Sequence, residues 1–199
     1  HSYSSAASDV YKRQIQSAQV IHEFTHDSFY VGEDGPTHQP VEHAMSLRAI
    51  PNFNVFRPAD AMETAVCFRI ALETINTPSA LLLTRQSLPV LDQNYQSLDI
   101  NVRKGAYIIH DCEETPEIIF LATGSEVSLA LETARLFPEK NVRVVSMPCL
   151  ELFDRQSDDY KALIIPRRGS LKVSIEAGIT LGWEKYIGVN AVSYTHLRA

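Results

Sequence analysis

The chain has 199 residues and a net charge of −6, with 45% hydrophobic and 21% charged residues, which suits a globular protein with one large or two small domains. The acidic balance argues against a nucleic-acid or anionic-membrane surface, and no apolar run approaches the roughly 18 residues of a bilayer span. The cysteines, Cys67, Cys112 and Cys149, form no C-x-x-C pair, which argues against a disulfide framework or zinc site and favours a reducing compartment.

Both ends differ in character from the rest of the chain. Residues 1–14 have no clear period, and residues 193–199 follow an abrupt change of composition. We expect both to be non-native tails, translated from vector or sequencing remnants, and leave them out of the fold prediction. The alternative is an ordinary pair of frayed termini.

Residues 15–90 predict a first α/β unit of the βαβαβ type, with right-handed crossovers. Asp60 with Glu63 three positions later resembles a capping box at a helix start, and the apolar run 79–84 is typical of a buried parallel strand. The predicted elements are a strand over 20–25, a loop over 26–40, a helix over 41–50, a short strand over 53–56, a helix over 60–75 and a strand over 79–84.

Residues 91–102 are polar without a sustained period and predict an interdomain linker. Residues 103–192 predict a second α/β unit, in which Ser125 caps a helix. Its predicted elements are strands over 106–109, 117–123, 142–147 and 171–175 and helices over 126–136 and 156–165. The predicted fold class is α/β, with two successive units of mostly parallel sheets flanked by helices.

The loop 26–40 concentrates groups able to do chemistry. It follows a predicted strand, and ligands of open α/β sheets lie outside the carboxyl ends of strands. His26 and His38 can shuttle protons near neutral pH, and Asp34 lies on a turn that glycine and proline hold. A rigid carboxylate beside a histidine can orient a substrate hydroxyl. The alternative is that Asp34 and His38 cap local turns.

Arg85 follows the buried strand 79–84, on the rim expected to carry the loop. An arginine there suits a phosphate, which it can bind bidentately; the alternative is a surface ion pair. Neither a His-x-x-x-His pair on a helix nor a tight histidine–carboxylate set occurs, so we predict no metal ligand. Trp183 is expected to pack in a core or an interface.

Four long motifs carry a resemblance to a known family. They are THDSFYVGEDGPTHQP at 25–40, FRPAD at 56–60, LTRQSLP at 83–89 and ATGSEVSLA at 122–130. In wording and order, from about Ile15 to Val192, the chain resembles the transketolases. Phe29-Tyr30 replaces the Ile-Gly often found in that family and leaves the catalytic positions unchanged.

The resemblance implies a cytoplasmic, homodimeric enzyme of the pentose phosphate pathway. It implies thiamine diphosphate with Mg²⁺ or Ca²⁺, and transfer of a two-carbon ketol unit from a ketose phosphate to an aldose phosphate. It further implies that His38 contacts the donor's carbonyl or C1 hydroxyl and that Asp34 binds a donor hydroxyl and sets stereochemical preference. It assigns His26 and Arg85 to the sugar phosphate. We expect no nucleic-acid or membrane partner.

The departure from the family is length. Family members have a first domain for the diphosphate and its metal, and an upstream glutamate and aromatic residues for the aminopyrimidine. We therefore expect the pyrimidine-binding domain in part at 15–90 and most of the C-terminal domain at 103–192. We assign no cofactor-binding residue or metal ligand here and expect the isolated chain to be inactive. The alternatives are a non-catalytic C-terminal subunit of a split enzyme and a relative of dihydroxyacetone synthase; deoxyxylulose-phosphate synthase normally lacks the GEDGPTHQP wording.

Overall fold

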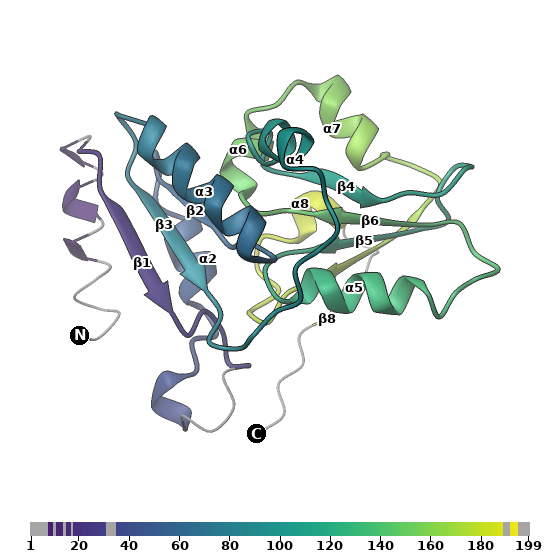
Figure 1. Ribbon diagram of the computed structural model, residues 1–199, viewed down its shortest axis with the longest axis horizontal. Helices are drawn as coiled ribbons and strands as arrows, with labels where there is room; N and C mark the ends of the chain where they lie inside the picture. The colour runs from purple at the N-terminus through teal and green to yellow at the C-terminus, as the bar shows by residue number, and fades with distance from the viewer. Residues whose placement is uncertain are drawn as a thin grey trace.

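The computed structural model describes residues 8–9, 11–13, 15–16, 18–30, 35–188 and 192–194, which form two sheets side by side (Figure 1). The first has the order β1-β3-β2, all parallel, and the second the order β4-β6-β5-β7-β8, parallel except for β4 against β6. The strands are β1 (Ile21–Thr25), β2 (Asn54–Phe56), β3 (Ser79–Leu83), β4 (Tyr107–His110), β5 (Ile118–Ala122), β6 (Val142–Ser146), β7 (Leu171–Ile175) and β8 (Val192–Tyr194). The predicted α/β class is confirmed.

The helices flank these sheets (Figure 1). They are η1 (Pro36–His38), α2 (His43–Arg48), α3 (Ala61–Glu73), α4 (Tyr95–Val102), α5 (Glu126–Ala134), α6 (Leu150–Asp154), α7 (Asp158–Ile164) and α8 (Glu184–Ile187). Alternate residues of β5 enter different cores: Ile119 packs with α6, α7 and α8, whereas Phe120 packs with α5. The second sheet therefore has a buried layer on each face, as a largely parallel sheet requires.

The start of α3 confirms the predicted helix but changes its cap. The Asp60 carboxylate accepts a hydrogen bond of 2.8 Å from the Glu63 N–H, as an N-cap does. Glu63 reaches back to the Ala59 N–H at 2.6 Å, one residue earlier than in a capping box. The expectation that Ser125 caps α5 is wrong, because its hydroxyl donates to the Glu126 carboxylate and caps no backbone N–H.

The stretch 91–102, predicted as an irregular linker, contains the helix α4. Asn94 caps it by accepting from the Gln96 and Ser97 N–H groups. Leu98 and Val102 are fully buried one turn apart, in a core cluster shared with α3 and β4. Two apolar residues at this spacing anchor the helix, although its other positions are mainly polar. The position of the domain boundary stays a prediction.

The outer edge of β2 is covered by the second unit. The Val55 N–H donates to Glu151 Oε2 at 3.1 Å, and the Arg57 N–H donates to the Pro148 carbonyl at 2.8 Å. Glu63, fully buried, accepts from Tyr107 and so joins α3 to β4. The two units therefore share both polar contacts and a core.

At the carboxyl end of the chain, β8 pairs with β7 through residues 192–194. Two of these residues, Ser193 and Tyr194, belong to the stretch predicted as a tail, and the origin of that tail stays a prediction. Among the residues that the structure describes, no helix combines the length and apolarity of a membrane span.

Candidate functional site

The loop 26–40 begins where β1 ends, at the carboxyl edge of the first sheet. Thr25 at the end of β1 pairs in register with Leu83 at the end of β3, so the loop and the segment after β3 leave the same edge. His26 has a φ of 59°, a left-handed backbone conformation that is uncommon outside glycine. Such conformations cluster at functional sites because the surrounding structure must hold them.

The structure brings His26 and His38 together, as expected for one site. Their ring centroids are 6.0 Å apart. His26 Nδ1 lies 3.0 Å from Thr25 Oγ1, and His38 Nδ1 lies 3.1 Å from Thr37 Oγ1. Each imidazole thus has a hydroxyl at one nitrogen, which orients the ring. His38 belongs to the short helix η1, whose preceding residue Gly35 has a φ of 78° that favours glycine.

The structure says less about the two other predicted site residues, Asp34 and Arg85. Asp34 lies outside the described residues, so its position stays a prediction. Arg85 is exposed and follows β3 at the same sheet edge as His26. The neighbouring Gln86 donates a side-chain hydrogen bond to the Tyr30 carbonyl, which ties this segment to the loop. Arg85 therefore follows β3 at the sheet edge from which the loop leaves, and its contact with a phosphate stays a prediction.

Behind the loop, Asp27 anchors it to a buried arginine. Asp27 is 5% exposed, and its Oδ2 accepts from Arg57 Nε at 2.7 Å. Arg57 Nη1 also donates to the carbonyl and hydroxyl of Thr123, at 3.0 and 2.8 Å, and to the Glu126 carboxylate. Arg57 thus joins the residue next to His26 to the start of α5 in the second unit.

Glu176, just after β7, completes this buried network. It forms a bidentate pair with Arg48 at 2.9 and 2.7 Å and accepts from the Thr123 hydroxyl at 2.7 Å. The indole of Trp183 donates to it at 3.0 Å, so Trp183 is a core residue as expected. We call Asp27, Arg48, Arg57, Glu126 and Glu176 the interdomain ion cluster.

Burial and charge oppose each other in this cluster. Burial alone would raise the pKa of Glu176, but Arg48, Arg57 and the Thr123 hydroxyl together lower it to about 2. Burial raises the pKa of Asp27 above its usual range, and Arg57 offsets this only partly, because Glu126 and Glu176 share the same guanidinium. The cluster holds three acidic residues against two arginines.

Sequence reasoning assigned no role to this cluster. The motifs FRPAD and ATGSEVSLA contain Arg57 and Glu126, but those positions are 69 residues apart and no local pattern pairs them. A usable signal was the placement of charged residues directly beside buried strands, at Arg57 after β2 and Glu176 after β7.

The start of the loop, the segment after β3 and the second unit also border an open pocket of about 410 Å³. Phe29 and Tyr30 line it from the loop, and Ser125 and Leu129 line it from the start of α5. Its volume is in the range of small-molecule sites. Among the described residues, no group of three or more histidine, cysteine, aspartate or glutamate side chains could hold a metal ion.

Comparison with known proteins matches almost the whole chain to two family models. The model of the transketolase pyrimidine-binding domain matches residues 4–90, and that of the transketolase-like C-terminal domain matches residues 105–196. The chain is 54% identical over 167 residues to a transketolase of Staphylococcus aureus (strain MW2), covering 83% of this chain and 25% of that protein. It is 46% identical over 176 residues to a transketolase of Aquifex aeolicus (strain VF5), covering 87% of this chain and 26% of that protein.

Solved structures agree. Transketolase from Leishmania mexicana superposes with a TM-score of 0.85 and 44% identity, covering 94% of this chain and 27% of that chain. A Pichia stipitis transketolase in complex with sedoheptulose 7-phosphate superposes with a TM-score of 0.88 and 38% identity, and the match covers 98% of this chain and 28% of that chain. An inactive β4 tetramer of a split-gene transketolase superposes with a TM-score of 0.65 and 22% identity, and the match covers 88% of this chain and 55% of that chain. At this identity the likeness shows a shared fold alone. The chain spans about a quarter of the length of the curated relatives it matches.

Proposed function

This chain belongs to the transketolase family, and from this premise we propose that it is part of a thiamine diphosphate-dependent transketolase. The enzyme moves a two-carbon ketol unit from a ketose phosphate to an aldose phosphate. The observation that carries the proposal is the approach of His26 and His38 at the carboxyl edge of a parallel sheet, inside the pyrimidine-binding domain. This is the edge at which open α/β sheets bind ligands.

The chain's own residues bind and orient the sugar. His26 and Arg85, at the same sheet edge, bind the phosphate of the donor or acceptor. His38 hydrogen-bonds the donor's carbonyl or C1 hydroxyl and polarises it, and Asp34 binds a neighbouring hydroxyl and sets stereochemical preference. The interdomain ion cluster fixes Asp27, and with it the start of the loop.

Thiamine diphosphate, when bound, supplies the nucleophilic carbon and the electron sink. The pyrimidine-binding domain implies dependence on this cofactor. The described residues offer no cluster of metal ligands, so we propose that the diphosphate and its Mg²⁺ or Ca²⁺ are anchored mainly by other parts of the complete protein. A homodimer, a cytoplasmic location and a place in the pentose phosphate pathway are further parts of the proposal, supported by the family.

The test is a chimera in which residues 15–192 replace the matching quarter of the Staphylococcus aureus relative. We expect this chimera to transfer ketol units from fructose 6-phosphate to an aldose phosphate. His38→Ala and Asp34→Ala should lower kcat by about a hundredfold or more, because each removes a group that acts on the reacting end of the donor. His26→Ala and Arg85→Ala should mainly raise KM.

The matched control is His110→Ala, an exposed histidine at the end of β4. It should leave both constants unchanged. Unaltered kinetics in the His38 and Asp34 variants would remove these residues from the site. Turnover by the 199-residue chain alone, with thiamine diphosphate and Mg²⁺, would contradict the proposal that the cofactor is anchored elsewhere.

A further inference from the structure

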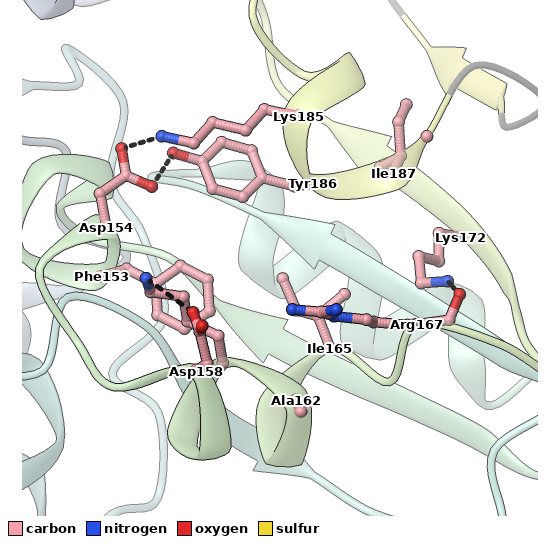
Figure 2. Close-up of a pocket in the computed structure, with 12 residues that line it drawn as sticks. Phe153, Asp154, Asp158, Ala162, Ile165, Arg167, Lys172, Lys185, Tyr186 and Ile187 are labelled. Atoms are coloured by element: carbon pink, nitrogen blue, oxygen red, sulfur yellow. Dashed lines mark hydrogen bonds and ion pairs between the residues drawn. The ribbon is translucent and has the colours of Figure 1, made fainter.

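A second cavity, of about 360 Å³, lies in the C-terminal domain between α6, α7, α8 and the start of β7 (Figure 2). None of its lining residues comes from the first unit or from the loop 26–40. It is lined by Phe153, Asp154, Asp158, Lys161, Ala162, Ile165, Arg167, Lys172, Lys185, Tyr186, Ile187 and Gly188. Its volume suits a small molecule.

Basic side chains outnumber acidic ones in this cavity, although the whole chain carries a net charge of −6. Two of its four cations have carboxylate partners. Lys185 Nζ lies 2.6 Å from Asp154 Oδ2, and Lys161 Nζ lies 3.6 Å from Asp158 Oδ1. Arg167 and Lys172 have no carboxylate partner among the described residues. The lining thus has a local excess of two positive charges.

Lys172 is the most unusual member of the set. It is only 8% exposed, and its one described hydrogen bond is to the Arg167 carbonyl at a long 3.4 Å. A buried ammonium is costly unless a counter-charge and hydrogen bonds compensate it. Figure 2 shows the Lys172 ammonium at the Arg167 carbonyl, with the Arg167 side chain extending from there toward Ile165, and the Asp154–Lys185 pair on the opposite side of the cavity. Two cations that lack counter-charges among the described residues therefore line the same open pocket.

We infer that this cavity binds the phosphate group of a small phosphorylated molecule. The Arg167 guanidinium can bind two phosphate oxygens at once, and Lys172 supplies a second positive charge in the same lining. Phe153 and Tyr186 give an apolar wall for a carbon skeleton, and Tyr186 is already fixed by donating to Asp154 at 3.0 Å. The inference rests on the C-terminal domain alone and does not depend on the proposed activity.

The experiment is a titration of the ¹⁵N-labelled 199-residue chain, followed by two-dimensional NMR. Inorganic phosphate and ribose 5-phosphate are the two probes. We expect saturable shifts at the amides of Arg167, Lys172 and Lys185. Tighter binding of ribose 5-phosphate identifies a phosphate ester as the ligand, whereas equal binding identifies phosphate itself, and both outcomes support the site.

Two variants and a control make the titration decisive. Arg167→Ala, at an exposed position that leaves the core unchanged, and Lys172→Met should each weaken binding about tenfold, since each removes a charge-assisted hydrogen bond. Arg168→Ala, the exposed neighbour outside the cavity, should bind as the parent chain does. The His26→Ala/Arg85→Ala double variant should retain these shifts. Shifts that scatter over surface lysines, or that persist in both cavity variants, would overturn the inference.

Discussion

Glu176 is a buried carboxylate whose ionised form is stabilised by the Arg48 guanidinium, the Thr123 hydroxyl and the Trp183 indole. Its pKa of about 2 in the folded chain lies below the ordinary glutamate pKa of 4.5. A carboxylate with a lowered folded pKa binds fewer protons folded than unfolded. Its contribution to stability is therefore present above about pH 4.5 and is lost as the pH falls toward about 2.

We predict that Glu176→Gln lowers the free energy of unfolding at pH 7 and flattens its fall between about pH 5 and 2, because the titrating group is gone. The measurement is urea denaturation across this pH range. Glu139→Gln, an exposed control, should leave the curve parallel to that of the parent chain. An acid limb of unchanged steepness in Glu176→Gln would show that other carboxylates set it.

At the level of single residues, the sequence predicted only those parts of the site whose residues lie close together along the chain. His26 and His38 lie in one loop of 15 residues, so their meeting followed from the loop itself. Arg57 was different, because its partners Asp27 and Glu126 lie 30 and 69 residues away. Contacts over such separations depend on how the two units dock, which no short pattern encodes.

Among the secondary-structure elements, α4 shows why a short helix is hard to recognise from the hydrophobic periodicity of the sequence. It has eight residues and buries only Leu98 and Val102, so its apolar face is two positions wide. The short helices α6 and α8 were missed for the same reason. The long α3 and the apolar runs of β3 and β5 were recognised because burial of many residues leaves a repeated pattern.

We predict that Asn94→Ala lowers the free energy of unfolding by about 1 kcal/mol, since it removes the acceptor for two N–H groups of the first turn of α4. Gln96→Ala, exposed on the same turn, is the matched control and should change stability by less than about 0.5 kcal/mol. Hydrogen exchange should locate the loss of protection in α4. Equal effects of the two substitutions would contradict a capping role.

For the whole molecule, the two units are expected to unfold together. They share the interdomain ion cluster, the backbone hydrogen bonds of Arg57 and the core cluster that joins α3 to β4. The single tryptophan, Trp183, reports on the second unit, and hydrogen exchange of β1 and β3 reports on the first. We predict that both probes give one coincident denaturation transition in the parent chain.

Arg57→Met should destabilise the chain by about 3–5 kcal/mol, because it leaves Asp27 and Glu126 buried without their counter-charge. It should also separate the two transitions, since the cluster bridges the units. Arg155→Met, at an exposed arginine after α6, serves as the control and should change neither quantity. Coincident transitions of undiminished stability in Arg57→Met would assign the coupling to the shared core alone.

The fold class of the molecule was predictable from the sequence, but the direction and order of its strands were not. The alternation of strands and helices indicated two α/β units with mostly parallel sheets, which are present. The antiparallel direction of β4 carries no mark in its four residues, because strand direction is set by the path of the chain through α4. The strand order likewise depends on long-range pairing.

The covered edge of β2 has a consequence for behaviour in concentrated solution. Open strand edges recruit strands of other molecules and seed aggregates. In this chain Glu151 and the Pro148 carbonyl accept the N–H groups of Val55 and Arg57 that point away from β3. Contact between the units thus shields this strand edge from β-pairing with other molecules, and a substitution that loosens the contact should expose the edge as a template for intermolecular β-structure.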